Sequence, residues 1–190
     1  FNEKLAVLCQ HDFRAQLLSE TNSDERLAYR VSCWERIFPL GDPPDYEPSP
    51  KKSIAARAAY ARKDPAEFAY DLLMENGGKT ILYRPLSNYT YGNLDTVKDM
   101  FSHPNSLIGL GDGGAHVSIL SDASAFTYML THWTRDRARG DKMPLPWAIK
   151  RLTRDNAAAI GLNDRGLLRP GYKADINVID YDRLQLHAPQ

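Results

Sequence analysis

The sequence has little cysteine, no excess of either charge and no long apolar run, and each absence excludes a class of protein. Cys9 and Cys33 are the only two cysteines among 190 residues, too few for a disulfide framework. Lys plus Arg balances Asp plus Glu, 24 against 24, so we expect no nucleic-acid partner and no membrane surface. No apolar stretch approaches membrane-spanning length. We therefore expect an ordinary globular, cytoplasmic protein.

Three short catalytic motifs are also absent. The chain contains no H-x-H and no H-E-x-x-H, which bind zinc, and no G-x-S-x-G, which carries a serine nucleophile. A complete metal site therefore cannot be assembled from this sequence alone. The chain begins at Phe1 without a targeting signal, and we expect an N-terminal part to be missing.

Helical and strand-like patterns alternate through the middle of the chain, which is typical of parallel βα units. The proline- and acid-rich stretch 34–50 predicts a long loop. Asp64-Pro65 predicts a capped helix start, and Gly77-Gly78 predicts its end. Further helices are expected over 3–19, 53–62, 124–139 and 145–160, and strands over 79–84, 106–111 and 173–180.

The run 106–116 (SLIGLGDGGAH) carries the chemistry. An apolar stretch ends in Asp112, with glycines on both sides that allow a sharp turn and the close approach of a ligand. In a βα barrel, catalytic groups lie at the carboxyl ends of strands. A carboxylate there can take a proton from metal-bound water, whose pKa the metal lowers to about 7, and pass it to a leaving amine. Asp112 is therefore the predicted catalytic base and a metal ligand.

Two other interpretations of this run stay open. Asp112-Gly113 is also a strong hairpin-turn signal, although no matching strand follows at hairpin distance. Gly109, Gly111 and Gly114 fit the dinucleotide fingerprint G-x-G-x-x-G. That fingerprint requires an immediate helix and a second strand, whereas an irregular Ser/Asp stretch follows here.

Several other polar residues are candidates either for substrate binding or for an ordinary structural role. His116 follows Asp112 closely and is a candidate substrate-binding residue or a loop histidine bonded to the backbone. Asn88 and Tyr89 follow the strand 79–84 on the same expected rim, so they are candidates for substrate binding or for an ordinary loop. The arginines at 135, 137 and 139 predict a solvated helix face.

Five segments of the chain form one pattern: 36–48 (RIFPLGDPPDYEP), 109–116 (GLGDGGAH), 130–133 (LTHW), 153–162 (TRDNAAAIGL) and 164–180 (DRGLLRPGYKADINVID). This pattern resembles the amidohydrolase superfamily, specifically the D-aminoacylase-like N-acyl-D-amino-acid deacylases of amidohydrolase family 3. Where that family usually has Ser-Asp-Gly, this chain has Gly111-Asp112-Gly113.

The resemblance implies an α/β fold: the C-terminal part of a TIM-like (β/α)8 metal-dependent hydrolase barrel, with a short β tail that joins a small β-sandwich. Residues 1–170 would form the partial barrel and 171–190 the tail. It implies one or two divalent metals, most often Zn2+, and hydrolysis of a non-peptide amide C–N bond in an N-acyl amino acid or a related amide. Asp112 would match the strand-end catalytic aspartate, and His116 a histidine that often follows it.

The remaining metal ligands are expected outside this chain, because they belong to earlier strands. A barrel takes about 250 residues, so a missing N-terminal barrel segment or a second copy of the chain would have to complete it. The first hypothesis is an N-acyl-D-amino-acid deacylase. The second is a catalytically inactive, truncated barrel piece that binds a partner chain through its open edge or is vestigial.

Overall fold

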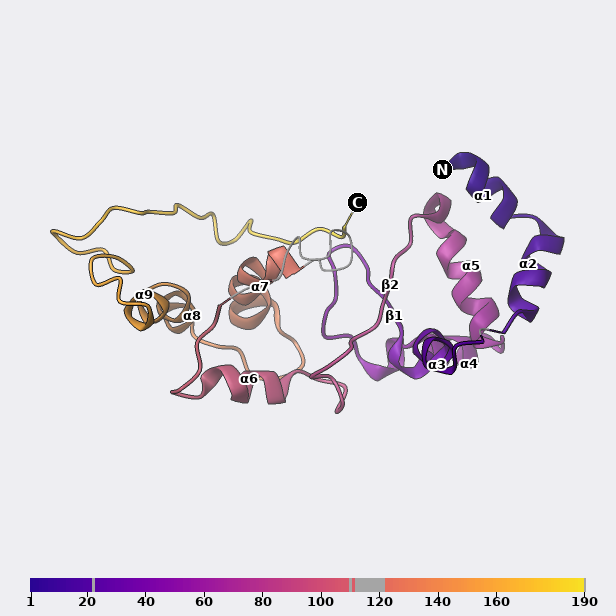
Figure 1. Ribbon diagram of the computed structural model, residues 1–190, viewed down its shortest axis with the longest axis horizontal. Helices are drawn as coiled ribbons and strands as arrows, with labels where there is room; N and C mark the ends of the chain where they lie inside the picture. The colour runs from indigo at the N-terminus through magenta and orange to yellow at the C-terminus, as the bar shows by residue number, and fades with distance from the viewer. Residues whose placement is uncertain (22, 110, 112–121, 190) are drawn as a thin grey trace. The chain divides into compact units, whose positions relative to one another are not determined.

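The computed structural model describes residues 1–21, 23–109, 111 and 122–189 of the chain. These residues form two compact units, Phe1–Leu94 and Asp95–Gln190 (Figure 1). Helices account for most of the regular structure in both units. None of the helices in these ranges combines the length and the apolarity that a membrane crossing requires.

The first unit is built from short helices whose starts follow the capping residues in the sequence. Ser53 Oγ accepts a hydrogen bond from the Ala56 amide at the start of α4, and Asp64 accepts from Ala66 and Glu67 at the start of α5. Both helix starts confirm the sequence prediction. The helical segments are α1 (Asn2–Leu8), α2 (His11–Ser19), α3 (Glu25–Ser32), η1 (Trp34–Arg36), η2 (Pro50–Lys52), α4 (Ile54–Ala61) and α5 (Pro65–Gly78).

The single helix expected over 3–19 is wrong, because α1 and α2 are separated at Cys9 and Gln10. The carbonyl of Leu8 accepts a hydrogen bond from the Tyr70 hydroxyl of α5. That bond satisfies a carbonyl that the end of α1 leaves without a helical partner. Packing of α1 against α5 therefore determines where the first helix ends (Figure 1). The local periodicity of the sequence cannot predict this packing.

A two-stranded sheet lies within the first unit. Strands β1 (Phe38–Pro39) and β2 (Leu82–Tyr83) pair antiparallel, with Phe38 opposite Tyr83 and Pro39 opposite Leu82. The expected loop 34–50 thus contains a strand, and the strand expected over 79–84 is shorter than predicted. The buried core beside the sheet consists of Ile37, Ile54, Ala69 and Leu72, with Trp34, Phe68 and Leu82 packed against it.

The second unit contains α6 (Asp95–Ser102), η3 (Asp122–Ser124), α7 (Ala125–Thr131), η4 (His132–Asp136, a π-helical turn), α8 (Leu145–Leu152) and α9 (Arg154–Ala159). Its core includes Met129, Leu130, Trp133 and Ala148, which are all buried. The Phe101 ring of α6 meets the Trp133 ring edge-on, with 4.6 Å between centroids. The helix expected over 145–160 is interrupted at Thr153, whose φ of −121° and ψ of −82° are not helical.

The solvated arginine face expected on the helix 124–139 is wrong for Arg137 and for Arg135, whose guanidinium donates to the tail carbonyls of Asp182 and Leu184 and whose side chain is only 24% exposed. The α-helix ends at Thr131 and the π-helical turn ends at Asp136, and the Arg137 side chain is fully buried. Its guanidinium lies 4.7 Å from the centroid of the Trp133 ring and donates a hydrogen bond to the Asp141 carbonyl at 3.0 Å. A change of backbone direction at the end of the π-helical turn brings this cation inward, which helical periodicity cannot predict.

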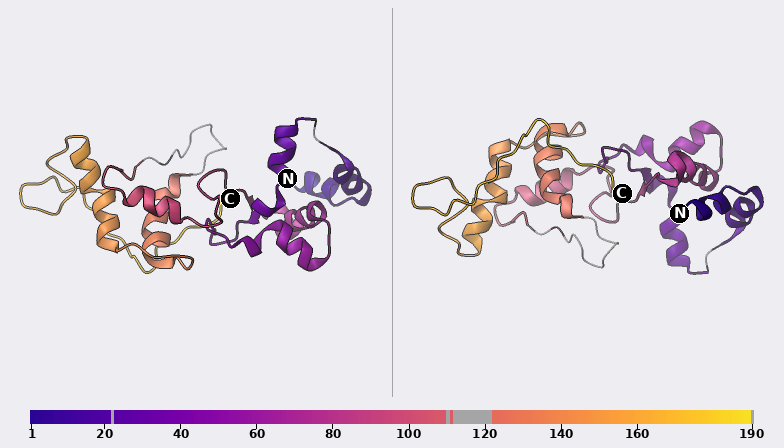
Figure 2. Two further views of the ribbon diagram at one scale, coloured as in Figure 1. Left: turned by 90° about the horizontal axis from the view of Figure 1, so that it is seen from below. Right: turned by 90° about the horizontal axis from the view of Figure 1, so that it is seen from above.

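Two expected strands are also missing from the described residues. Residues 106–109 and 111 form no strand, and neither does the tail 173–180, which runs as an irregular chain (Figure 2, yellow). The only sheet in the described ranges is antiparallel, whereas the alternating pattern predicts parallel units. A strand needs a neighbouring strand to take its N–H and C=O groups, and among the described residues only β1 and β2 pair in this way. The expected boundary at residue 170 stays a prediction.

Candidate functional site

The two central residues of the predicted site, Asp112 and His116, lie outside the described residues. The chain that leads to them is described as far as Gly109, and again at Gly111. The structure therefore provides the geometry of the approach to Asp112.

The side chains of Arg151 and Asn156 hold this approach segment by its carbonyl groups. Arg151 Nη2 donates to the carbonyls of Phe101 at 3.0 Å, His103 at 3.4 Å and Ser106. Asn156 Nδ2 donates to the carbonyl of Ile108 at 2.6 Å. Together these two side chains, which we call the carbonyl anchor, bond four carbonyl oxygens of the segment 101–108.

The charge of Arg151 is balanced nearby. Asp155 Oδ2 lies 3.5 Å from Arg151 Nη1 and accepts a hydrogen bond from Lys150 Nζ at 2.8 Å. The Lys150 ammonium, followed by Arg151, lowers the pKa of the Asp155 carboxyl below its ordinary value. Asp155 is therefore ionised at neutral pH and compensates the cation, whose side chain is only 10% exposed.

Asn88 and Tyr89, the other predicted substrate residues, lie in the loop between β2 and α6. The Tyr89 hydroxyl donates to the Pro48 carbonyl at 2.5 Å, and its ring meets Phe38 edge-on at 6.4 Å between centroids. Asn88 is exposed and has φ of +58°, the left-handed conformation that asparagine tolerates better than most residues. Tyr89 is thus held by the fold, whereas the Asn88 side chain is open to solvent.

The Tyr89 side chain also lines an open cavity of about 390 Å³. The Glu35 carboxylate at its edge accepts hydrogen bonds from its own backbone amide and from the Cys33 thiol, and both lower its pKa. The cavity therefore offers aromatic walls, an anion and a cation, a combination suited to binding a small polar molecule. Its lining residues are Glu35, Arg36, Phe38, Pro50, Tyr89, Thr90, Tyr91 and Gly92.

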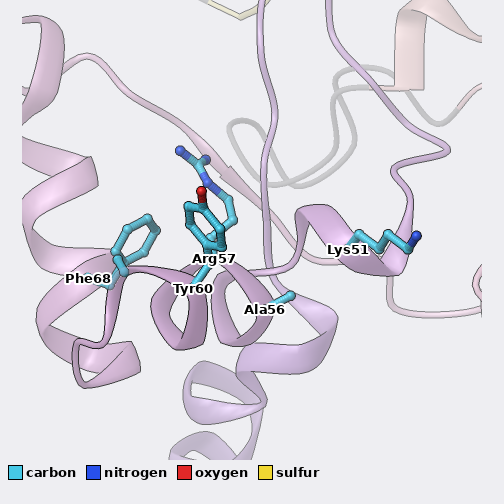
Figure 3. A pocket seen from close by; sticks show the side chains of 6 residues that line it. Lys51, Ala56, Arg57, Tyr60 and Phe68 are labelled. Atoms are coloured by element: carbon cyan, nitrogen blue, oxygen red, sulfur yellow. The ribbon is translucent and has the colours of Figure 1, made fainter.

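A second hollow, of about 540 Å³, opens between α4 and α5 (Figure 3). The Arg57 guanidinium lies over the Phe68 ring at 5.3 Å from its centroid, and Tyr60 beside them is 94% exposed. No residue predicted from the sequence to be functional lines this hollow. Its lining residues are Lys51, Ala56, Arg57, Tyr60, Ala61 and Phe68.

The described residues do not fit a metal ion by themselves. Within the described ranges, no group of three or more His, Cys, Asp or Glu side chains is arranged to hold one. Cys33 and Glu35 approach each other at 3.3 Å, but they form only a pair.

The chain belongs to the amidohydrolase family, which it matches over residues 53–190, or 138 of its 190 residues. No curated protein and no solved structure matches the chain. Membership supports a hydrolase function and implies a TIM-barrel-like fold, in a family that is generally metal-dependent. The matched range includes Asp112, His116, Asn88, Tyr89 and the carbonyl anchor.

From the sequence, Asn156 is only a member of the segment 153–162, which resembles the amidohydrolase family, and Arg151 has no predicted role. The signal was present in the run 153–162, which continues directly from α8. Which backbone atoms these side chains reach depends on contacts 45 to 50 residues apart in sequence. Such contacts become visible only in three dimensions.

Proposed function

We propose that this chain supplies the catalytic carboxylate of a metal-dependent amidohydrolase that removes the acyl group from N-acyl-D-amino acids. The observation that carries the proposal is the family match over residues 53–190, which includes the strand-end-like run with Asp112. The proposed preference for D-amino acids rests on the resemblance of the sequence to the D-aminoacylase-like deacylases.

In this proposal Asp112 performs both proton transfers. Its carboxylate accepts a proton from the water that attacks the amide carbon, so that a C–O bond forms. The carboxyl group then gives that proton to the amine nitrogen as the C–N bond breaks, which releases an acid and an amine and returns Asp112 to its ionised state. A bound divalent metal, with Zn2+ proposed, lowers the pKa of water and polarises the carbonyl oxygen in such enzymes.

Three further residues are proposed to contact the substrate. His116 follows Asp112 by four residues, and the exposed Asn88 directly precedes Tyr89, which lines the cavity. Because the Tyr89 hydroxyl already donates to Pro48, we assign to Tyr89 a contact through its ring. Asn88, whose side chain is exposed, is assigned a hydrogen bond to the substrate.

The remaining metal ligands are proposed to come from outside this chain, from a preceding barrel segment or from a second copy. Supporting this, the strand-like tail leaves Ile176 and Val178 exposed at 59% and 97%. Apolar side chains of a strand-like segment are normally covered by neighbouring strands. We propose that the completed protein works in the cytoplasm.

The exposed tail also favours one alternative, in which the chain is a catalytically inactive barrel piece that binds a partner or is vestigial. Measuring metal content and amide hydrolysis on the completed protein, with the segment or second copy that supplies the remaining metal ligands, separates the two hypotheses. The deacylase proposal predicts stoichiometric zinc and release of free amine from N-acetyl-D-amino acids, with the L-enantiomers as matched controls. Stoichiometric zinc without hydrolysis of either enantiomer, or no bound metal at all, would overturn the proposal and leave the inactive alternative.

A further inference from the structure

The open cavity of about 390 Å³ lies in the first unit, and several of its lining residues are firmly placed by the fold. Phe38 and Tyr89 are buried, and their rings pack edge-on against each other. Gly92 approaches Pro50 so closely that a Cβ would lie 2.9 Å from Pro50 Cγ, and its φ of +67° also favours glycine. The cavity is therefore a defined feature of this unit, with a volume typical of small-molecule sites.

Glu35 and Arg36 bring opposite charges to this cavity from consecutive positions of η1. The backbone of η1 is anchored, because the Arg36 amide donates to the Cys33 carbonyl at 2.8 Å and the next residue, Ile37, belongs to the buried core. The two charged residues are nevertheless accessible, since Glu35 is exposed and Arg36 is half-buried. A fixed backbone thus presents an anion and a cation to the same cavity.

The two charges remain available to a ligand. The Glu35 carboxylate accepts hydrogen bonds from its own backbone amide and from the Cys33 thiol at 3.3 Å, and these bonds lower its pKa more than the Arg36 charge does. The carboxylate is therefore ionised at neutral pH, and it can accept further bonds, since a carboxylate has about four acceptor sites. The Arg36 guanidinium forms no hydrogen bond or ion pair with any residue that the structure describes.

A ligand that satisfies both charges must carry a cation and an anion close together. An anion alone is repelled by Glu35, and a cation alone is repelled by Arg36. A guanidinium binds a carboxylate through two parallel hydrogen bonds, and a carboxylate binds an ammonium through charge-assisted hydrogen bonds. An α-amino acid has both groups on one carbon atom, and an apolar side chain suits the aromatic wall of the cavity.

We propose that this cavity binds a free α-amino acid as a zwitterion, with its carboxylate on Arg36, its ammonium on Glu35 and its side chain against the Tyr89 ring. The inference deepens the proposed function and rests on it in one respect, because a free amino acid is the product of the proposed deacylation. The N-acyl substrate has an amide nitrogen and lacks the ammonium. The product therefore binds the cavity more tightly than the substrate does and inhibits the reaction.

The first test titrates the completed protein with D-leucine by isothermal calorimetry and compares two molecules that each lack one of its charges. Isocaproate lacks the ammonium and isoamylamine lacks the carboxylate, while both keep the branched side chain. We expect D-leucine to bind at least about tenfold more tightly than either, because each lost charged hydrogen bond weakens binding by about that factor. Equal affinities for the three molecules would overturn the inference.

Two variants assign the charges to their residues. Glu35→Gln should weaken D-leucine binding about tenfold without weakening isocaproate binding, whereas Arg36→Met should weaken the binding of D-leucine and isocaproate but not of isoamylamine. Glu25→Gln and Arg30→Met are the matched controls, since both residues are exposed in α3 and do not line the cavity. All four variants should keep the wild-type melting temperature. Wild-type affinity for D-leucine in both cavity variants overturns the inference.

Hydrolysis of N-acetyl-D-leucine separates this inference from the proposed function. D-leucine should inhibit the hydrolysis competitively, and Glu35→Gln should weaken that inhibition about tenfold while KM changes less than about twofold. If the protein does not hydrolyse N-acetyl-D-leucine but its binding of D-leucine depends on Glu35 and Arg36, the proposed function fails and the amino-acid site stands. If hydrolysis occurs and neither variant changes the binding of D-leucine, the inference alone fails.

Discussion

Arg137 donates a hydrogen bond from Nη2 to Asp95 Oδ1 at 2.6 Å, although its own side chain is fully buried and that of Asp95 is 55% exposed. The pair connects the residue that follows the π-helical turn η4 with the first residue of α6, 42 positions earlier. A buried guanidinium needs such bonds, because an uncompensated charge in the interior is costly. This contact is a principal connection between two helical segments of the second unit.

Replacing Arg137 by Met should lower the free energy of unfolding by about 2–4 kcal/mol, since charged hydrogen bonds and the contact with the Trp133 ring are lost together. Urea unfolding followed by circular dichroism measures the change. Arg183→Met, at an exposed position of the tail, is the control and should leave the midpoint unchanged. An equal midpoint for the two variants would contradict the assigned role of Arg137.

The cap of α5 offers a second test. Asp64 Oδ1 accepts hydrogen bonds from the amides of Ala66 at 2.8 Å and Glu67 at 3.2 Å. Asp64→Ala should therefore cost about 1 kcal/mol of stability, and Asp64→Asn, which keeps an acceptor, should cost less. Glu67→Gln removes a carboxylate from the same turn and shows whether charge alone explains the loss. Thermal unfolding of the three variants decides between bonding and charge.

Acid should weaken the first unit through Asp71. The Lys63 ammonium first and the Arg14 guanidinium second, at 2.8 and 2.9 Å, lower the pKa of this carboxyl in the folded chain. Its contribution is therefore fully present above the unfolded-state pKa of about 3.9 and is lost as the pH falls below that value. Because the Asp71 side chain is 39% exposed, we expect less than about 1 kcal/mol.

The measurement for Asp71 compares urea unfolding at pH 6 and pH 3 in the wild type and in Asp71→Asn. The variant should lose less stability between the two pH values. Asp12→Asn, at an exposed position in α2, serves as the control and should follow the wild type. A variant with the full wild-type pH dependence would refute the assignment.

Variants of Asn88 distinguish a role in substrate binding from a purely structural role in the loop. Its φ of +58° favours glycine, so Asn88→Gly should keep the wild-type stability, while Asn88→Val should cost about 1–2 kcal/mol. If the amide bonds the substrate, Asn88→Gly raises KM several-fold, as the loss of one hydrogen bond requires. An unchanged KM in Asn88→Gly assigns this residue to the loop alone.

Local signals in the sequence predict several helix ends correctly but do not predict which segments pair as strands. Ser53, Asp64 and Gly161 mark helix boundaries in the structure as expected, and Gly161 adopts a φ of +79°. Caps of this kind depend on neighbours within a few residues. Strand pairing depends on distant segments, and β1 meets β2 across more than 40 residues of chain.

The residues of the candidate site also differ in how well the local sequence predicts them. Asp112 could be singled out because a carboxylate between glycines at the end of an apolar run is a local pattern. The roles of Arg151 and Arg137 could not be predicted, since a cation in a helical pattern is normally solvated and only the folded chain shows what it bonds. Tyr89 was chosen by its place after a strand, and its bond to Pro48 was not visible in the sequence.

The most direct test of the account replaces Asp112 by Asn in the active enzyme and measures the hydrolysis of an N-acetyl-D-amino acid. We expect kcat to fall about 100- to 10,000-fold, with unchanged circular dichroism and melting temperature. Asp99→Asn, at an exposed position in α6, should keep the wild-type rate. A fully folded Asp112→Asn enzyme with wild-type turnover would contradict the assignment of Asp112 as the catalytic carboxylate.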